Sequence, residues 1–272
     1  MGSHTKMTPV VGNRGIRVRW SNAPTRRAII FVHGYNGDTL KTWKQFDDFL
    51  PSDPNAAGYD LIFYGYDGLY GTIWPLSQAL CDFLTQFNQH PGGLQTKQPA
   101  PAAKLRSQPY DRVIVVAHSL GAILARWALI MANNQGCTWM PKTELVLFAP
   151  AHNGARPGQL VRFAFGGLSF LRFFAAYALF KSPLIDELDS GSRIFKRFRS
   201  DVKTALKGGK CPFLRARMVI QASKERVVHN GPFENDPPLW SPTDFVNADH
   251  SSVCKPTSYF PAPFDALRNL LP

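Results

Sequence analysis

The sequence predicts an α/β domain built on a mostly parallel β-sheet with helices on both faces. First, several short runs are almost entirely apolar, and one of them, 113–116, consists of four β-branched residues, which is typical of a strand buried on both faces. Second, helix-like segments separate several of these runs, as in βαβ units. Third, a chain of 272 residues can bury a sizeable core. The predicted buried strands are 27–32, 59–64, 113–116, 144–149 and 216–222.

The N-terminal half begins with a segment, 1–14, that we expect to be a flexible N-terminus. Alternation of apolar and polar residues over 15–20 predicts an edge strand, which opens a single domain covering 15–272. Over 75–88, apolar residues recur at helical spacing and predict an amphipathic helix. The segment 92–109 is rich in Pro, Ala, Gln and Lys, so we expect an exposed loop.

Composition narrows the class of protein. Hydrophobic residues make up 44% of the chain and charged residues 18%, which suits a globular enzyme and not a disordered chain. No apolar stretch reaches the length of about 18 residues that a membrane-spanning helix needs. The four cysteines are widely separated without a CxxC pair, so we do not expect a metal site. A cytoplasmic or membrane-peripheral location is favoured, but secretion stays open because residues 1–4 could be an expression remnant.

The pentapeptide Ala117-His118-Ser119-Leu120-Gly121 follows one buried strand and precedes a helical segment, 122–129. A serine on a sharp strand-to-helix turn is the context of a nucleophile elbow, in which the hydroxyl stands above the sheet edge. The turn leaves room only for small residues two places before and after the serine, here Ala117 and Gly121. Glycine is usual at the first of these positions. The alternative is a serine that caps an ordinary core helix.

A serine nucleophile needs a base, and the base needs a carboxylate to orient it. In this type of site the chain order is serine, acid, histidine, and the acid follows a strand end. Glu225 is the carboxylate close to the end of strand 216–222, whereas the loop 150–154 after the preceding strand has no acid. We therefore expect Glu225 to be the acid; its alternative is a surface residue paired with Lys224 or Arg226.

His250 is the histidine expected to act as the base. It lies 25 residues after Glu225, in a loop before the last predicted helix, 264–271. The other histidines fit less well. His4 is terminal, His90 is in a polar loop, His152 follows the wrong strand, His229 is too close to the acid, and His33 and His118 should support loops beside the motifs.

Backbone donors must also stabilise the oxyanion of a tetrahedral intermediate. We expect the N–H groups of Leu120 and of Tyr35 to serve, the latter in the loop after strand 27–32 where Gly34 permits a close approach. About 65 residues separate strand 144–149 from strand 216–222, far more than one crossover helix needs. We interpret residues 155–210 as a helical cap. Its aromatic segment 163–180 provides expected substrate-pocket residues, namely Phe163, Phe165, Phe170 and Phe174.

The chain is strongly basic, with a formal net charge of +12. Seven cations lie between residues 193 and 210, and Phe195, Phe198, Val202 and Leu206 recur among them at helical spacing. This pattern predicts a basic amphipathic helix. Its apolar face either docks on the core or meets an anionic membrane surface. Nucleic acid is not an expected partner because no recognised motif accompanies the charge. The oligomeric state stays open.

Four blocks resemble the lipase-like serine esterase branch of the α/β-hydrolase superfamily, and within it the serine-active-site-containing proteins linked to phospholipid remodelling and their bacterial relatives. The blocks are Val32-His33-Gly34-Tyr35-Asn36-Gly37-Asp38 with Thr42-Trp43, Tyr64-Gly65-Tyr66-Asp67, the pentapeptide around Ser119, and His250-Ser251-Ser252-Val253-Cys254-Lys255-Pro256. The resemblance implies an α/β-hydrolase fold, and acyl-ester hydrolysis by Ser119, Glu225 and His250 without metal or cofactor. Relatives commonly carry a Thr-Pro-His-Arg-Gly type of segment where this chain has residues 149–154, so the acyl pocket transfers least.

The sequence therefore predicts a carboxylesterase or lipase that acts through a Ser-His-Glu triad and an acyl-enzyme, on an ester or lipid substrate. Phospholipase or acyltransferase chemistry on anionic lipid would use the same triad. The alternative from another class is a catalytically silent hydrolase scaffold that binds a membrane or a partner protein.

Overall fold

A computed structural model describes residues 3–89, 94–97, 109–164, 182–209, 211–231, 233, 236 and 247–271, except for the side chains of residues 14, 163, 164 and 208. In these ranges the chain folds around a seven-stranded sheet of order β1-β2-β4-β3-β5-β6-β7. The strands are β1 Thr8–Val10, β2 Asn13–Arg19, β3 Arg27–Val32, β4 Asp60–Tyr64, β5 Arg112–His118, β6 Thr143–Phe148 and β7 Ala216–Ile220. Pairing is antiparallel from β1 through β2 to β4 and parallel from β4 to β7, which confirms the predicted fold class.

The N-terminal edge of the sheet differs from the expectation. Within the segment predicted to be flexible, residues 8–10 form β1, which pairs with β2 in a register that sets Thr8 opposite Val18. Thr8 and Val10 are buried, so this short strand has a packing role that a three-residue pattern does not reveal.

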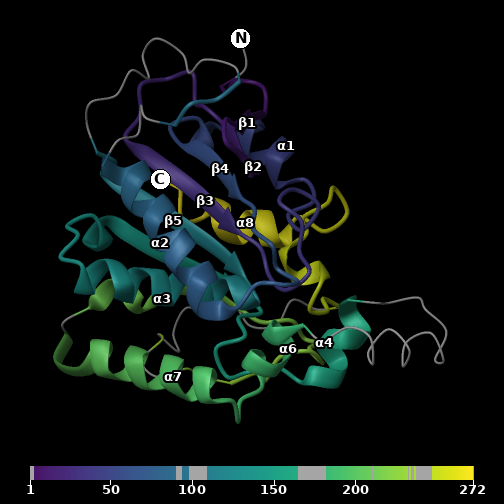
Figure 1. The fold of residues 1–272 in the computed structure, drawn as a ribbon. Helices are drawn as coiled ribbons and strands as arrows, with labels where there is room; N and C mark the ends of the chain where they lie inside the picture. Colours follow the sequence, from purple (N-terminus) through teal and green to yellow (C-terminus); the bar gives the residue numbers. More distant parts are fainter. Residues whose placement is uncertain are drawn as a thin grey trace.

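Helices cover both faces of the sheet (Figure 1). They are α1 Phe46–Ser52, α2 Ile73–Gln89, α3 Leu120–Asn134, α4 Pro157–Ala164, α6 Pro183–Leu188, α7 Arg193–Leu206 and α8 Ala262–Arg268. One core contains residues of α2, α3 and α7. The second core lies on the other face and contains Phe46 of α1 and Leu267 of α8. Among the described helices none is long and apolar enough to cross a membrane.

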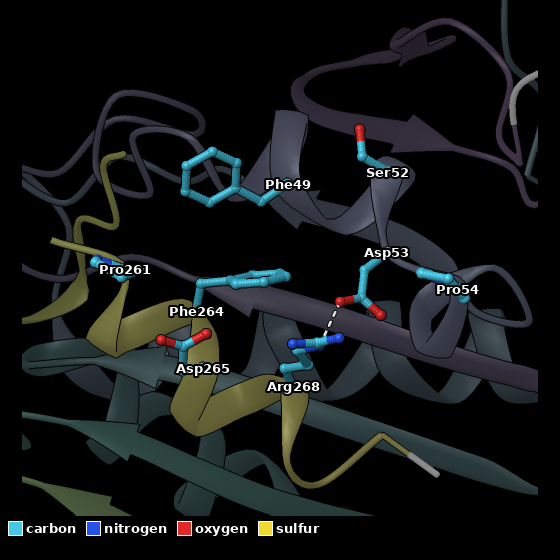
Figure 2. A pocket seen from close by; sticks show the side chains of 8 residues that line it. All are labelled: Phe49, Ser52, Asp53, Pro54, Pro261, Phe264, Asp265 and Arg268. Carbon is cyan, nitrogen blue, oxygen red and sulfur yellow. Dashed lines mark ion pairs between the residues drawn. The ribbon is translucent and has the colours of Figure 1, made fainter. Parts of the chain in front are cut away.

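A surface pocket lies between α1 and α8, as Figure 2 shows. The rings of Phe49 and Phe264 approach within 5.4 Å, centroid to centroid. Nearby, Arg268 donates to Asp53 across a distance of 2.6 Å. This pocket contains none of the residues that the sequence predicts to form an active site.

Helix α7 docks its apolar face on the rest of the protein. Phe195, Phe198, Val202 and Leu206 are all buried, and the Phe198 ring meets Trp127 of α3 at 5.7 Å. Of the two interpretations of this face, contact with the core is the one observed. The cations of the helix remain on its exposed side.

Candidate active site

Ser119 occupies the turn between β5 and α3 with a strained backbone, φ 52° and ψ −119°. A non-glycine residue at positive φ persists only where its surroundings hold it. Here the Ser119 N–H donates to the Phe148 carbonyl at 3.0 Å. Helix α3 also approaches β3 so closely that a Cβ on Gly121 would lie 2.3 Å from the Val32 carbonyl oxygen. The strand, strained turn and helix predicted around Ser119 are therefore all present.

Three segments far apart in the chain bring Ser119, His250 and Glu225 into one line of hydrogen bonds. His250 Nε2 lies 3.0 Å from Ser119 Oγ, and His250 Nδ1 lies 2.8 Å from Glu225 Oε2. Ser119 and His250 are 1% and 3% exposed, so both groups are shielded from water. A carboxylate can only accept, so the His250 proton belongs on Nδ1, and Nε2 is left to accept from the serine hydroxyl.

Glu225 is held by main-chain donors from its own loop. Its Oε1 accepts from the N–H groups of Val227 and Val228 at 2.7 and 3.0 Å. Burial alone raises the pKa of Glu225, but the hydrogen bond and charge of His250, together with these two amides, outweigh burial and leave the pKa below its usual value. The carboxylate consequently stays ionised at neutral pH.

The predicted oxyanion donors lie on two segments that flank Ser119. Leu120 is the first residue of α3, where backbone N–H groups have no partner within the helix. The loop after β3 comes close to the nucleophile, because a Cβ added to Gly34 would lie 2.8 Å from Ser119 Cβ. Tyr35 follows directly, and its side chain is 2% exposed.

His33 supports the loop after β3, as expected from the sequence. Its ring stacks on Tyr66 with centroids 4.2 Å apart, and the Tyr66 hydroxyl donates to the His33 carbonyl at 2.7 Å. Burial lowers the pKa of the His33 ring. His152 is not brought to Ser119 by any described hydrogen bond; its ring stacks on Phe233 at 4.5 Å, and burial lowers its pKa far below the usual value.

Sequence reasoning did not identify a buried ion pair behind the elbow. Arg126 of α3 is 0% exposed and donates through Nη2 to Asp236 Oδ1 at 2.7 Å. Its guanidinium lies 4.6 Å above the Phe233 ring, and Asp236 also accepts from the Ala216 N–H at 3.0 Å. The pair joins the segment after β7 to the elbow helix. One arginine within the apolar run 122–129 is the signal that could have revealed it.

Almost all of the expected substrate pocket lies outside the described residues. Phe163 lies in the last turn of α4, but its side chain is outside the description, and so are residues 165, 170 and 174 altogether. Among the described residues no group of three or more His, Cys, Asp or Glu side chains is arranged to hold a metal ion.

Comparisons with known proteins agree on the fold. No protein-family model matches the sequence, and no curated protein does. Among solved structures, the chain is similar to the mature form of a lipase from Bacillus licheniformis, BlEst2, with a TM-score of 0.58 and 18% identity over 92% of this chain and 93% of that one. Against the propeptide form the TM-score is 0.54 at 18% identity, over 96% of this chain and 52% of the longer one.

A third solved structure is MGS-MChE2, an α/β-hydrolase from the metagenome of lagoon sediments at Mar Chica, Morocco. It aligns with a TM-score of 0.50 and 14% identity over 96% of each chain. The strand order, the elbow between β5 and α3 and these likenesses lead to one conclusion. This chain has the α/β-hydrolase fold.

Proposed function

We propose that this protein is a serine hydrolase of carboxylic esters. Ser119 Oγ attacks the ester carbonyl carbon while His250 Nε2 takes the hydroxyl proton. The tetrahedral intermediate collapses to an acyl-enzyme as His250 returns that proton to the leaving alcohol. Water, deprotonated by His250, then releases the acid and restores Ser119.

The observation that carries this proposal is the continuous path from Ser119 Oγ through His250 to Glu225, with distances of 3.0 and 2.8 Å. Each link has the donor and acceptor types that general-base activation needs. The strain at Ser119 supports the same role, because unfavourable backbone geometry is characteristic of functional turns. Such a path also weighs against a silent scaffold, which has no need of an oriented base.

The charge that develops on the substrate oxygen is assigned to the backbone N–H groups of Leu120 and Tyr35. Loss of one such donor typically costs about 2.7–4 kcal/mol of barrier. Support comes from the approach of Gly34 to Ser119, which leaves no space for a side chain between the loop and the nucleophile. The hole therefore depends on the path of the main chain and not on the Tyr35 ring.

A series of p-nitrophenyl esters from acetate to palmitate tests the proposal, with the parent protein and a folded Ser119→Ala variant measured together. Hydrolysis by the parent and its loss in Ser119→Ala support the assignment, and the preferred chain length separates an esterase from a lipase. Hydrolysis that survives in Ser119→Ala would reject the nucleophile. A parent protein inactive on every ester would reject this substrate class.

A further inference from the structure

Helix α7 carries a row of cations on the side opposite its buried face. Arg193, Lys196, Lys203 and Lys207 are all exposed. Arg193, Lys196 and Lys203 are spaced by three and seven residues, which aligns them along one face of α7, and Lys207 directly follows the helix. A helix of 14 residues such as α7 is about 21 Å long. We call these four residues the basic stripe.

No member of the stripe is paired with an acid of α7. Asp201 is the acid within α7, and it pairs with Arg197 at 3.7 Å beside the stripe. No ion pair between described residues involves a member of the stripe. The first turn holds no acid, so Arg193 lies at the end where the helix dipole disfavours a cation. Lys203 lies in the last turn, where the dipole favours a cation, so helix stability accounts for Lys203 but not for Arg193 or Lys196.

The position of α7 holds the stripe outward. One face of α7 is fixed against the core by its buried residues, Phe195, Phe198, Val202 and Leu206. The opposite face, which bears the stripe, is therefore held toward solvent. In Figure 1, α7 runs along the outer edge of the molecule, on the far side of α3 from the sheet. We propose that the basic stripe of α7 is a docking surface for an anionic lipid bilayer.

A bilayer fits the stripe better than a single-stranded nucleic acid does. Nonspecific binding of single strands uses aromatic side chains on which bases stack. Among the described residues, the exposed large hydrophobic side chains are Val11, Tyr70 and Tyr259, and none is in α7. A straight row of point charges, without a stacking platform or a base-reading motif, matches a diffuse anionic plane.

Because the apolar face of α7 is already buried, the contact is electrostatic and involves no insertion of this helix. Vesicles of phosphatidylcholine with about one third phosphatidylserine should therefore bind the full chain at low salt, and pure phosphatidylcholine vesicles should not. Binding should disappear when salt is raised to about 0.5 M, because screening then acts over a few ångströms.

The decisive comparison uses two folded variants of equal charge. Lys196→Glu with Lys203→Glu removes the centre of the stripe, whereas Lys6→Glu with Lys41→Glu changes exposed lysines near the other end of the sheet. Each cation at an anionic surface contributes about a fivefold change in affinity, so we expect the stripe variant to bind about 25-fold more weakly or worse. The control variant should stay within about threefold of the parent.

Equal loss in both variants would show a general charge effect and overturn the stripe. Equal binding of anionic and neutral vesicles, or binding that persists at high salt, would overturn the electrostatic contact. Stronger binding to duplex DNA than to anionic vesicles at the same salt would overturn the bilayer as the occupant. None of these results depends on hydrolysis, so the docking surface is tested apart from the proposed function.

A second, independent observation concerns His118, which directly precedes Ser119 in the chain and is hydrogen-bonded to the main chain of His250. The side chain is buried, and its Nε2 is 2.8 Å from the backbone oxygen of His250. A carbonyl can only accept, so the His118 proton is on Nε2. The bare Nδ1 faces the Gly34 main chain, where an added Cβ would lie 3.0 Å away.

We infer that His118 is a positioning residue for His250. Its hydrogen bond holds the main chain from which the His250 imidazole extends, and its own peptide link to Ser119 holds the nucleophile. The distance between the His118 and His250 rings is 4.8 Å, so a second positive charge there would oppose an imidazolium at His250. Burial lowers the pKa of His118 far below its usual value and keeps the ring neutral. This inference rests on the proposed function.

His118→Gln and His118→Phe separate the hydrogen bond from mere packing. Glutamine reaches Nε2 through as many bonds as histidine does and can donate to the His250 carbonyl, whereas phenylalanine keeps a ring without a donor. We expect kcat for ester hydrolysis to fall at least about tenfold in His118→Phe with KM unchanged, and to recover most of that loss in His118→Gln.

An active parent with unchanged kcat in His118→Phe would overturn this inference alone. Equal losses in the two variants would also overturn it, because only the hydrogen bond distinguishes them. A parent that hydrolyses no ester would instead overturn the proposed function, and the positioning role with it. Thermal unfolding of each variant confirms that the comparison is made between folded proteins.

Discussion

Glu225 divides its two oxygens between the backbone and His250. Oε2 lies 2.8 Å from His250 Nδ1, and Oε1 accepts from the Val227 and Val228 amides. The loop therefore fixes the carboxylate, and the carboxylate fixes the imidazole. Orientation of the base depends on the charge at Oε2, while the fold of the loop depends on Oε1.

Glu225→Gln should separate these two tasks. The amide oxygen can keep the bonds to Val227 and Val228, which places the NH₂ group against His250 Nδ1 and favours the wrong imidazole tautomer. We expect kcat to fall by about 10²–10⁴ with little change in the free energy of unfolding. Steady-state kinetics and urea unfolding measure both. An unchanged kcat in a folded variant would show that Glu225 does not orient His250 for catalysis.

Gly34→Ala should damage the oxyanion loop. The new methyl would lie 2.8 Å from Ser119 Cβ and 3.0 Å from His118 Nδ1, so the loop must shift away. We expect the free energy of unfolding to fall by about 1–3 kcal/mol. We also expect kcat to fall more than it does in a control variant that has room for the new methyl group. Gly58→Ala is the matched control, because its nearest neighbour is an arginine nitrogen at 3.8 Å. Equal activity in the two variants would contradict the assigned hole.

Arg126→Met should destabilise the protein by about 3–5 kcal/mol, because it leaves the largely buried Asp236 without its cation. The double variant Arg126→Met with Asp236→Leu should recover part of this loss, although the Ala216 amide then loses its acceptor. Denaturant unfolding of the parent, Arg126→Met, Asp236→Leu and the double variant gives the coupling free energy of the pair. An Arg126→Met variant as stable as the parent would show that the ion pair with Asp236 does not stabilise the folded protein.

Stability should decline between pH 7 and pH 5. Burial lowers the pKa values of His33, His118 and His152 in the folded protein. Below about pH 6.5 the unfolded chain binds protons that the folded protein does not, so unfolding becomes easier as pH falls. Each ring contributes a slope of up to about 1.4 kcal/mol per pH unit. Carboxylates such as Glu225 add to the loss only near and below about pH 4.3.

Urea unfolding at several pH values measures this slope. His152→Phe keeps the stack on Phe233 and removes one titrating ring, so its profile should be shallower than that of the parent. A parent whose stability does not change between pH 7 and pH 5 would contradict the neutral, buried state of these histidines.

The central strands were predictable because short, almost continuously apolar runs identify strands that are buried on both faces. Strand 27–32 has the predicted bounds, and the helix predicted over 75–88 extends over Ile73–Gln89. Helix α1 was not predicted, since it has seven residues and includes Pro51, which disfavours a helical interior. β1 is too short for any periodicity.

Part of the candidate site was also predictable from the sequence and part was not. Chain order and the positions of strand ends predict Ser119, Glu225 and His250 as the triad. The bond from His118 to His250 joins residues 132 apart in sequence, and neither pattern nor spacing indicates such a contact. Likewise, the pairing of Arg126 with Asp236 joins residues 110 apart in sequence, and only tertiary structure brings them together.

Active-site labelling tests directly whether Ser119 is the activated nucleophile. An alkyl fluorophosphonate reacts with a serine that an adjacent base activates and needs no particular ester. We expect one added phosphonate, mapped by peptide mass spectrometry to Ser119, and none in folded Ser119→Ala or, at equal times, in His250→Ala. A label at another serine, or equal labelling of His250→Ala and the parent protein, would contradict this expectation.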